Sequence, residues 1–124
     1  MYQNTLTLVG TMATDVVAAS TDEGVRLARF RLMLTRRHRD RVSKSYVNAD
    51  PTFVSVVCWR RLAENVLASL RRGDPVIVTG RLNVRIIDRD NRPRTVVEID
   101  ASAVGPDLNR VEASPARSEQ GTAA

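Results

Sequence analysis

The chain has 124 residues, enough for one domain with one core, and its single cysteine excludes an internal disulfide. Nineteen basic against fourteen acidic residues give a net charge of +5, which indicates an anionic partner such as nucleic acid, although a merely basic protein fits the same charge. The N-terminus has no basic segment followed by an apolar run. We therefore expect no signal peptide, no membrane span, and a reducing, cytoplasmic location.

The first part of the chain predicts two alternating strands. Thr and Leu alternate over residues 5–9, and Gly10 marks a bulge or a bend. In the second strand, residues 25–34, one face is apolar and is expected in the core: Ala28, Phe30, Leu32 and Leu34. Arg29 and Arg31 lie on its other face, a pattern typical of an antiparallel sheet buried on one side.

Two segments show no strand or helix periodicity. Residues 15–24 are rich in turn-forming residues. Residues 35–50 are predicted to form a long basic hairpin loop, with positive charges at Arg36, Arg37, Arg39, Arg41 and Lys44. A loop of this length in a compact domain is usually functional or disordered, and a run of charges is often merely solvated. Because this loop adjoins a strand that carries arginines, we expect both to contribute to one basic surface.

The strand over residues 53–59 has two different faces. Its even positions are small and apolar: Val54, Val56 and Cys58. Its odd positions include Phe53 and Trp59, roughly 20 Å apart at about 3.3 Å per residue. A core would draw both rings to the valine side. Their separation from it predicts that the rings serve a surface.

The sequence contains few residues suited to catalysis. One histidine and one cysteine cannot assemble a His/Cys metal cluster. Cys58 lies on the core face of its strand, so it cannot form a nucleophile pair with His38. No glycine-rich phosphate loop follows a predicted strand. We expect no enzyme activity and no cofactor.

The second half predicts a helix and two further strands. Apolar residues over 61–70 have helical spacing, and Gly73 is expected to be the left-handed C-cap. A strand runs from Pro75 to Leu82 or Ile87, and after a turn over 88–92 the last strand covers 94–104.

This element order predicts an all-β protein with the OB fold, a five-stranded barrel with one helix between strands 3 and 4. The predicted domain covers residues 1–105. Residues 106–124 contain few apolar side chains and no aromatic one, so we expect a short disordered tail.

Single-stranded nucleic acid is held by a basic groove and by rings that stack on bases. The candidate rings are Phe53, Trp59 and Tyr46, and the candidate cations are Arg29, Arg31, Arg36, Arg37, Arg81 and Arg85. His38 either contacts the nucleic acid or is solvated. The alternative for Trp59 is a core residue at a strand end, and for Phe53 an interface residue.

Four motifs at compatible spacing resemble the bacterial single-stranded DNA-binding proteins, over roughly residues 4–105: NTLTLVG from Asn4, ARFRL from Ala28, WRRLAEN from Trp59 and RGDPVIVTGRL from Arg72. The resemblance implies an OB fold, a homotetramer, and sequence-independent binding of single-stranded DNA in replication, recombination or repair. The stacking positions of that family fall on Phe53 and Trp59, a third on or near His38, and a fourth on Ile87.

The chain departs from that family in four places. His38 and Ile87 stand where the family often has aromatic rings, and Asp15-Val16 replaces its usual Asp-Pro. The family's tail commonly ends in an acidic tip that recruits partner enzymes, whereas this chain ends in Gly-Thr-Ala-Ala. Recruitment of repair enzymes is therefore not expected, and a second copy beside a standard protein fits the sequence. An RNA-binding OB module and a protein–protein scaffold remain as alternatives.

Overall fold

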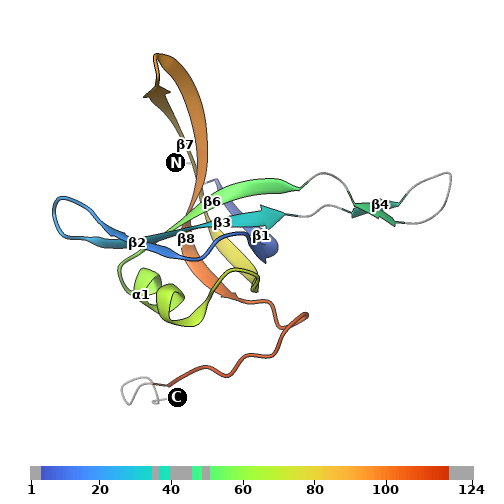
Figure 1. The fold of residues 1–124 in the computed structure, drawn as a ribbon. Coiled ribbons are helices and arrows are strands. Elements are labelled where there is room, and N and C mark those ends of the chain that lie inside the picture. Colours follow the sequence, from blue (N-terminus) through green and yellow to red (C-terminus); the bar gives the residue numbers. More distant parts are fainter. Residues whose placement is uncertain (1–3, 35–36, 40–45, 49–50, 118–124) are drawn as a thin grey trace.

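The computed structural model describes residues 4–34, 37–39, 46–48 and 51–117, and for 37–39 and 46–48 it gives the backbone alone. Figure 1 shows the strands wound around one another, with a helix beside them. In chain order the elements are β1 (Thr5–Met12), β2 (Val17–Ser20), β3 (Arg26–Leu34), β4 (Arg37–Arg39), β5 (Tyr46–Asn48), β6 (Thr52–Trp59), α1 (Arg60–Ser69), β7 (Pro75–Arg89) and β8 (Arg92–Pro106).

Five strands close into a ring in the order β1-β7-β8-β6-β3, and β3 returns to β1 through the pairs Thr11–Met33 and Met12–Leu32. The pairing of β6 with β8 is parallel and the other pairings in the ring are antiparallel. Helix α1 connects the third and fourth strands of this ring, β6 and β7. The predicted all-β OB fold, with its helix at that place, is therefore confirmed.

Gly10 pairs with Val76 of β7 and directly precedes Thr11, where the pairing of β1 with β3 begins. A Cβ atom at Gly10 would lie 2.5 Å from the carbonyl oxygen of Met33, so a side chain would force the two strands apart. Glycine therefore permits the bend through which the ring closes.

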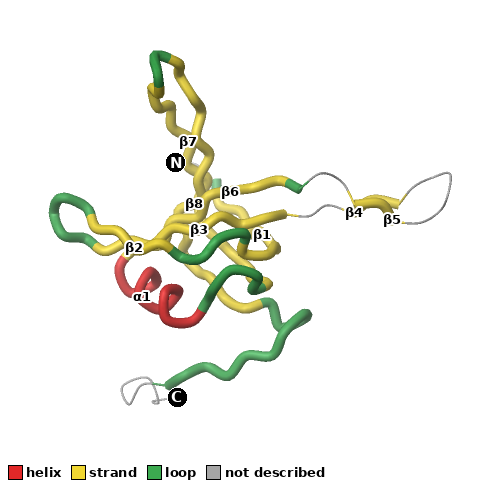
Figure 2. Tube along the Cα trace, in the orientation of Figure 1, coloured by secondary structure: helices red, strands yellow, loops and turns green. Residues whose placement is uncertain are grey.

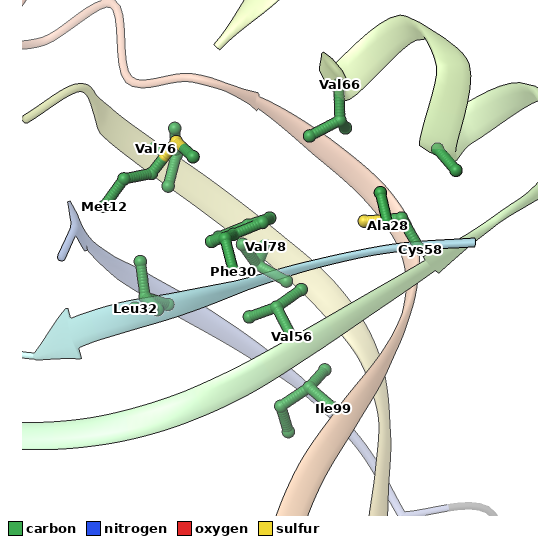
Figure 3. Close-up of a cluster of buried hydrophobic side chains, with 11 residues drawn as sticks. Met12, Ala28, Phe30, Leu32, Val56, Cys58, Val66, Val76, Val78 and Ile99 are labelled. Atoms are coloured by element: carbon green, nitrogen blue, oxygen red, sulfur yellow. The ribbon is translucent and has the colours of Figure 1, made fainter. Parts of the chain in front are cut away.

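The core lies inside the ring and is built from the predicted apolar faces. Phe30 is 2 % exposed, and Val56 and Cys58 of β6 are fully buried. Figure 3 shows Phe30 among valines from other strands, with Val66 reaching toward the cluster from α1. The prediction that Phe30 and Cys58 are core residues is confirmed.

The helix ends before the residue expected to cap it. Helix α1 stops at Ser69, and its C-cap, Leu70, has extended backbone angles. Gly73 does adopt a positive φ of 95°, but in the turn that follows, where the Arg71 N–H donates to the Asp74 carboxylate at 2.9 Å. The predicted capping role of Gly73 is wrong because this turn, rather than the helix end, needs the left-handed residue.

Short strands occur where the sequence shows no periodicity. Strand β2 lies within the turn-rich segment and pairs with the first half of β3. Strands β4 and β5 pair with each other within the basic segment and form a separate two-stranded sheet. Strands β7 and β8 are longer than predicted, because the turn between them consists only of Asp90 and Asn91, with φ of 53° and 61°. Figures 1 and 2 show both hairpins projecting away from the ring.

The segment that follows β8 contacts β1. The Arg110 guanidinium donates to the carbonyl oxygen of Gly10 at 2.7 Å and is paired with Asp107, which is 7 % exposed. These contacts fasten the segment after β8 to β1. In the described part of the chain, no helix has the length and apolar character needed to cross a membrane.

Candidate nucleic-acid interface

Strand registers place four neighbouring strands side by side, so that alternate residues share one surface outside the ring. Arg29 lies opposite Val57, and Asp100 of β8 lies beside Val57 on its other flank. Because opposed residues point to the same side of a sheet, these strands present one continuous surface. We call this surface the outer face, and its residues are Arg29, Arg31 and Met33 of β3, Phe53, Ser55, Val57 and Trp59 of β6, Glu98 and Asp100 of β8, and Arg81, Asn83, Arg85 and Ile87 of β7.

Phe53 and Arg31 are brought together at one end of the outer face. The guanidinium carbon of Arg31 lies 4.9 Å from the centre of the Phe53 ring, within the range of a cation–π contact. The Phe53 residue remains 44 % exposed. This end of the face therefore offers a solvent-accessible ring with a positive charge over it.

Trp59 lies at the other end of β6, where the strand passes directly into α1. It is 38 % exposed and borders an open hollow of about 430 Å³ together with Arg81 and Asp100. Trp59 is also the N-cap residue of α1, with extended backbone angles. The start of the helix thus fixes the backbone that carries the ring.

Between the two rings, the carboxylate of Glu98 forms ion pairs with two of the predicted cations, Arg29 and Arg85. The Arg85 Nη2 atom lies 2.6 Å from Oε1 of Glu98, and the Arg29 Nη1 atom lies 3.6 Å from Oε2. Neither Glu98 nor Asp100 was among the residues predicted to form the site. Their positions in the last strand give them a common face, but the parallel pairing of β8 with β6 has no local signature in the sequence. The four arginines of the outer face exceed its two carboxylates, so the face stays positive.

Val57 departs from the two-face pattern. It lies on the odd side of β6 with the two rings, yet it is only 2 % exposed and is not part of the core cluster inside the ring. Neighbouring side chains on the outer face therefore cover it. The middle of the face is packed, and its exposed rings lie at the two ends.

The side chains of the other predicted residues lie outside the description, except for Ile87. Arg36 lies outside the described residues. Arg37 and His38 belong to β4 and Tyr46 to β5, and their side chains are likewise outside the description. Ile87 lies beyond Arg85 on the projecting hairpin, opposite Arg94, and is partly buried.

Cys58 adjoins the outer face in sequence but points into the core. Burial raises the pKa of its thiol from 9.0 to about 11, because a thiolate would lose its hydration there. The thiol therefore stays protonated near neutral pH, which makes it a poor nucleophile.

Comparison with known proteins identifies related sequences along most of the chain. The model of the single-strand binding protein family matches residues 3–107. A single-stranded DNA-binding protein of Corynebacterium glutamicum is 37 % identical over 117 residues, which are 94 % of this chain and 52 % of that protein. One from Mycolicibacterium smegmatis is 40 % identical over 105 residues, 84 % of this chain and 64 % of that protein. The chain thus spans between half and two thirds of the length of these relatives.

The fold has a solved counterpart. A crystal structure of the small single-stranded DNA-binding protein from Streptomyces coelicolor superposes with a TM-score of 0.78 at 40 % sequence identity. The match covers 90 % of this chain and all of that one.

Proposed function

This chain belongs to the single-strand binding protein family, and on that premise we propose that it binds single-stranded DNA independently of base sequence. The observation that carries the proposal is the outer face, where the exposed rings of Phe53 and Trp59 stand at the ends of a strand flanked by arginines. Rings stack on any base, and arginines neutralise phosphates. Such a face holds a strand without recognising its sequence.

We assign specific roles to the residues of this site. Phe53 and Trp59 stack on bases, and Arg29, Arg31, Arg81 and Arg85 contact phosphates. Arg36, Arg37, His38 and Tyr46 extend the same site from the basic hairpin. Such a protein would act in the cytoplasm, where replication, recombination or repair exposes single strands.

A titration with a homopolymeric thymidine oligonucleotide tests the proposal. Trp59 is the only tryptophan, so its fluorescence should be quenched as bases stack on it. Affinity should fall steeply with salt, because neutralised phosphates release counterions. Duplex DNA of equal length is the first control, and binding it as tightly as the single strand would refute the proposal. A uridine homopolymer of equal length is the second, and tighter binding of it would favour the RNA-binding alternative.

We also propose a homotetramer, on account of β1. The segment from Thr5 to Gly10 pairs with β7 on one side, and its other side has no strand partner among the described residues. Val9 on this strand is 54 % exposed. A second copy pairing along β1 would cover both the unpaired backbone groups and this side chain.

Light scattering at micromolar concentration tests the assembly, with an expected mass of four times 13.7 kDa. The variant Val9→Asp should lower the assembled fraction, because it places a charge in the contact. Val17→Asp is the matched control, since Val17 is 64 % exposed on a different strand and should leave the mass unchanged. A wild-type monomer would refute the proposal.

We retain residues 1–105 as the binding domain and 106–124 as a tail. Within this tail, Asp107 and Arg110 contact each other, and Arg110 contacts β1, so the first part of the tail, as far as Val111, is held against the domain. Limited proteolysis tests this division, with early cleavage expected beyond Val111. Early cleavage between β7 and β8 would contradict it.

A further inference from the structure

Glu98 is the least exposed charged side chain on the outer face. The residue is 3 % exposed, and its carboxylate is surrounded by strands on both sides. Removing a carboxylate from water is unfavourable unless cations and hydrogen bonds replace its hydration. Two guanidinium groups supply that replacement, from Arg85 at 2.6 Å and from Arg29 at 3.6 Å. Glu98 is therefore buried beneath a pair of arginines.

The two arginines come from strands that are not neighbours. Arg29 belongs to β3 and Arg85 to β7, and β6 and β8 lie between these strands. Glu98 is the point at which both side chains meet. Two guanidinium groups in such proximity repel each other, and a carboxylate between them offsets the repulsion.

Both arginines keep capacity for another anion. Each side chain is 47 % exposed, although each is paired with the buried carboxylate. A guanidinium group has five N–H donors, more than one shared carboxylate can occupy. With about half of each side chain exposed, donors of Arg29 and Arg85 stay accessible to a ligand, and the three groups together carry one positive charge, which matches one phosphate diester.

We propose that Glu98 is a positioning residue that holds Arg29 and Arg85 as a joint receptor for one backbone phosphate of single-stranded DNA. This inference rests on the proposed function. Removing the charge of Glu98 should change the DNA affinity in opposite directions under two explanations. If the carboxylate acts only by its charge, it repels phosphate, and its removal should strengthen binding. If Glu98 positions the arginines, removing its charge weakens binding, because the two side chains lose their common anchor.

The variants Glu98→Gln and Asp100→Asn separate these two effects. Both replace a carboxylate by an amide of the same shape on the same strand and face. Among the residues described, no cation lies within ion-pair distance of Asp100. For D100N we expect tighter binding of a thymidine oligonucleotide and a salt slope steeper by up to about 0.7, as for one more neutralised phosphate. For E98Q we expect binding several-fold weaker than wild type and no steeper slope.

Double variants show whether the effect passes through the arginines. In the background of Arg85→Ala, the change E98Q should have little further effect, because one arm of the receptor is already absent. Arg29→Ala and Arg85→Ala should likewise combine to less than the sum of their separate losses. Urea denaturation of every variant establishes that it is folded at the assay temperature. If E98Q does not fold, the cycle of the two arginine variants decides.

Three outcomes overturn the inference. E98Q binding as tightly as wild type would show that Glu98 does not position the arginines, and tighter binding like that of D100N would show that Glu98 acts only through its charge. Additive losses in the two arginine variants would show independent contacts. A wild-type protein that binds no single strand would overturn the proposed function and this inference with it, whereas the first two results leave the proposed function intact.

Discussion

Trp59 should serve both the fold and the binding of DNA, and the variant Trp59→Ala should reveal the two contributions separately. The residue is 38 % exposed, so of the roughly 250 Å² that a tryptophan offers, about 150 Å² is buried. At about 25 cal/mol per Å², that burial contributes at most ~4 kcal/mol to the free energy of unfolding. We expect the variant to lose about 2–4 kcal/mol of that free energy, because alanine retains part of the contact.

The same variant should also lose one stacked base, which costs about 1–3 kcal/mol and raises the Kd roughly 5- to 150-fold. Fluorescence anisotropy of a labelled thymidine oligonucleotide measures the Kd, and urea denaturation measures the stability. Trp59→Phe keeps a ring and should lose less on both measures. A folded Trp59→Ala protein with the wild-type Kd but reduced stability would show that Trp59 is purely structural and would refute the assignment of the outer face.

Three further predictions address charge, protonation and backbone packing. Arg31→Ala should weaken binding and lower the salt slope by about 0.7, whereas Arg31→Lys should keep the slope. Equal slopes for wild type and both variants in anisotropy titrations would exclude a phosphate contact of Arg31. The pKa of the Cys58 thiol is raised to about 11 in the folded protein, so as the pH rises the thiol loses its proton first in the unfolded chain. The free energy of unfolding should therefore be unaffected below pH 9 and should fall by up to ~1.4 kcal/mol per pH unit toward pH 11. Urea denaturation at pH 8 and 10.5 should show this loss of unfolding free energy in wild type and a smaller loss in Cys58→Ala. Equal losses in the two proteins would contradict the prediction. Gly80→Ala should lower the midpoint of thermal unfolding by several degrees, because the added Cβ would lie 2.2 Å from the carbonyl oxygen of Asp100. Gly105→Ala is the control, since no atom lies within 4 Å of a Cβ at that position. Equal midpoints for the two variants would argue against the close contact at Gly80.

The period of a strand predicted much of the core and part of the outer face. In β3 and β6, alternation alone placed Phe30 and Cys58 inside and Phe53 and Trp59 outside, and their exposed fractions agree. Such patterns are local, since each depends only on which side of its own strand a residue faces. The order of strands and helix was then sufficient for the OB fold.

Features that depend on contacts between distant strands were not predictable. Val57 is buried on the side that alternation assigns to the surface, because side chains from other strands cover it. Glu98 was missed because its partners, Arg29 and Arg85, lie far away in the sequence and meet it only through the ring. Strand β2 is short, and its exposed residues leave no periodic pattern. These features arise from tertiary packing, which local propensity does not encode.

Closure of the ring sets the order in which the protein can fold. The β7–β8 hairpin joins segments adjacent in the chain, and hairpins of this kind form within about 1–10 μs. The pairing of β1 with β7 joins Thr5 to Arg81, and the parallel pairing joins Ser55 to Glu98. Such long-range pairings place folding of β proteins in about the millisecond-to-second range. Until the last pair of strands in the ring has formed, two strand edges remain unpaired and can pair with other chains. The yield of refolding from denaturant should therefore fall as the protein concentration rises, because such pairing leads to aggregation.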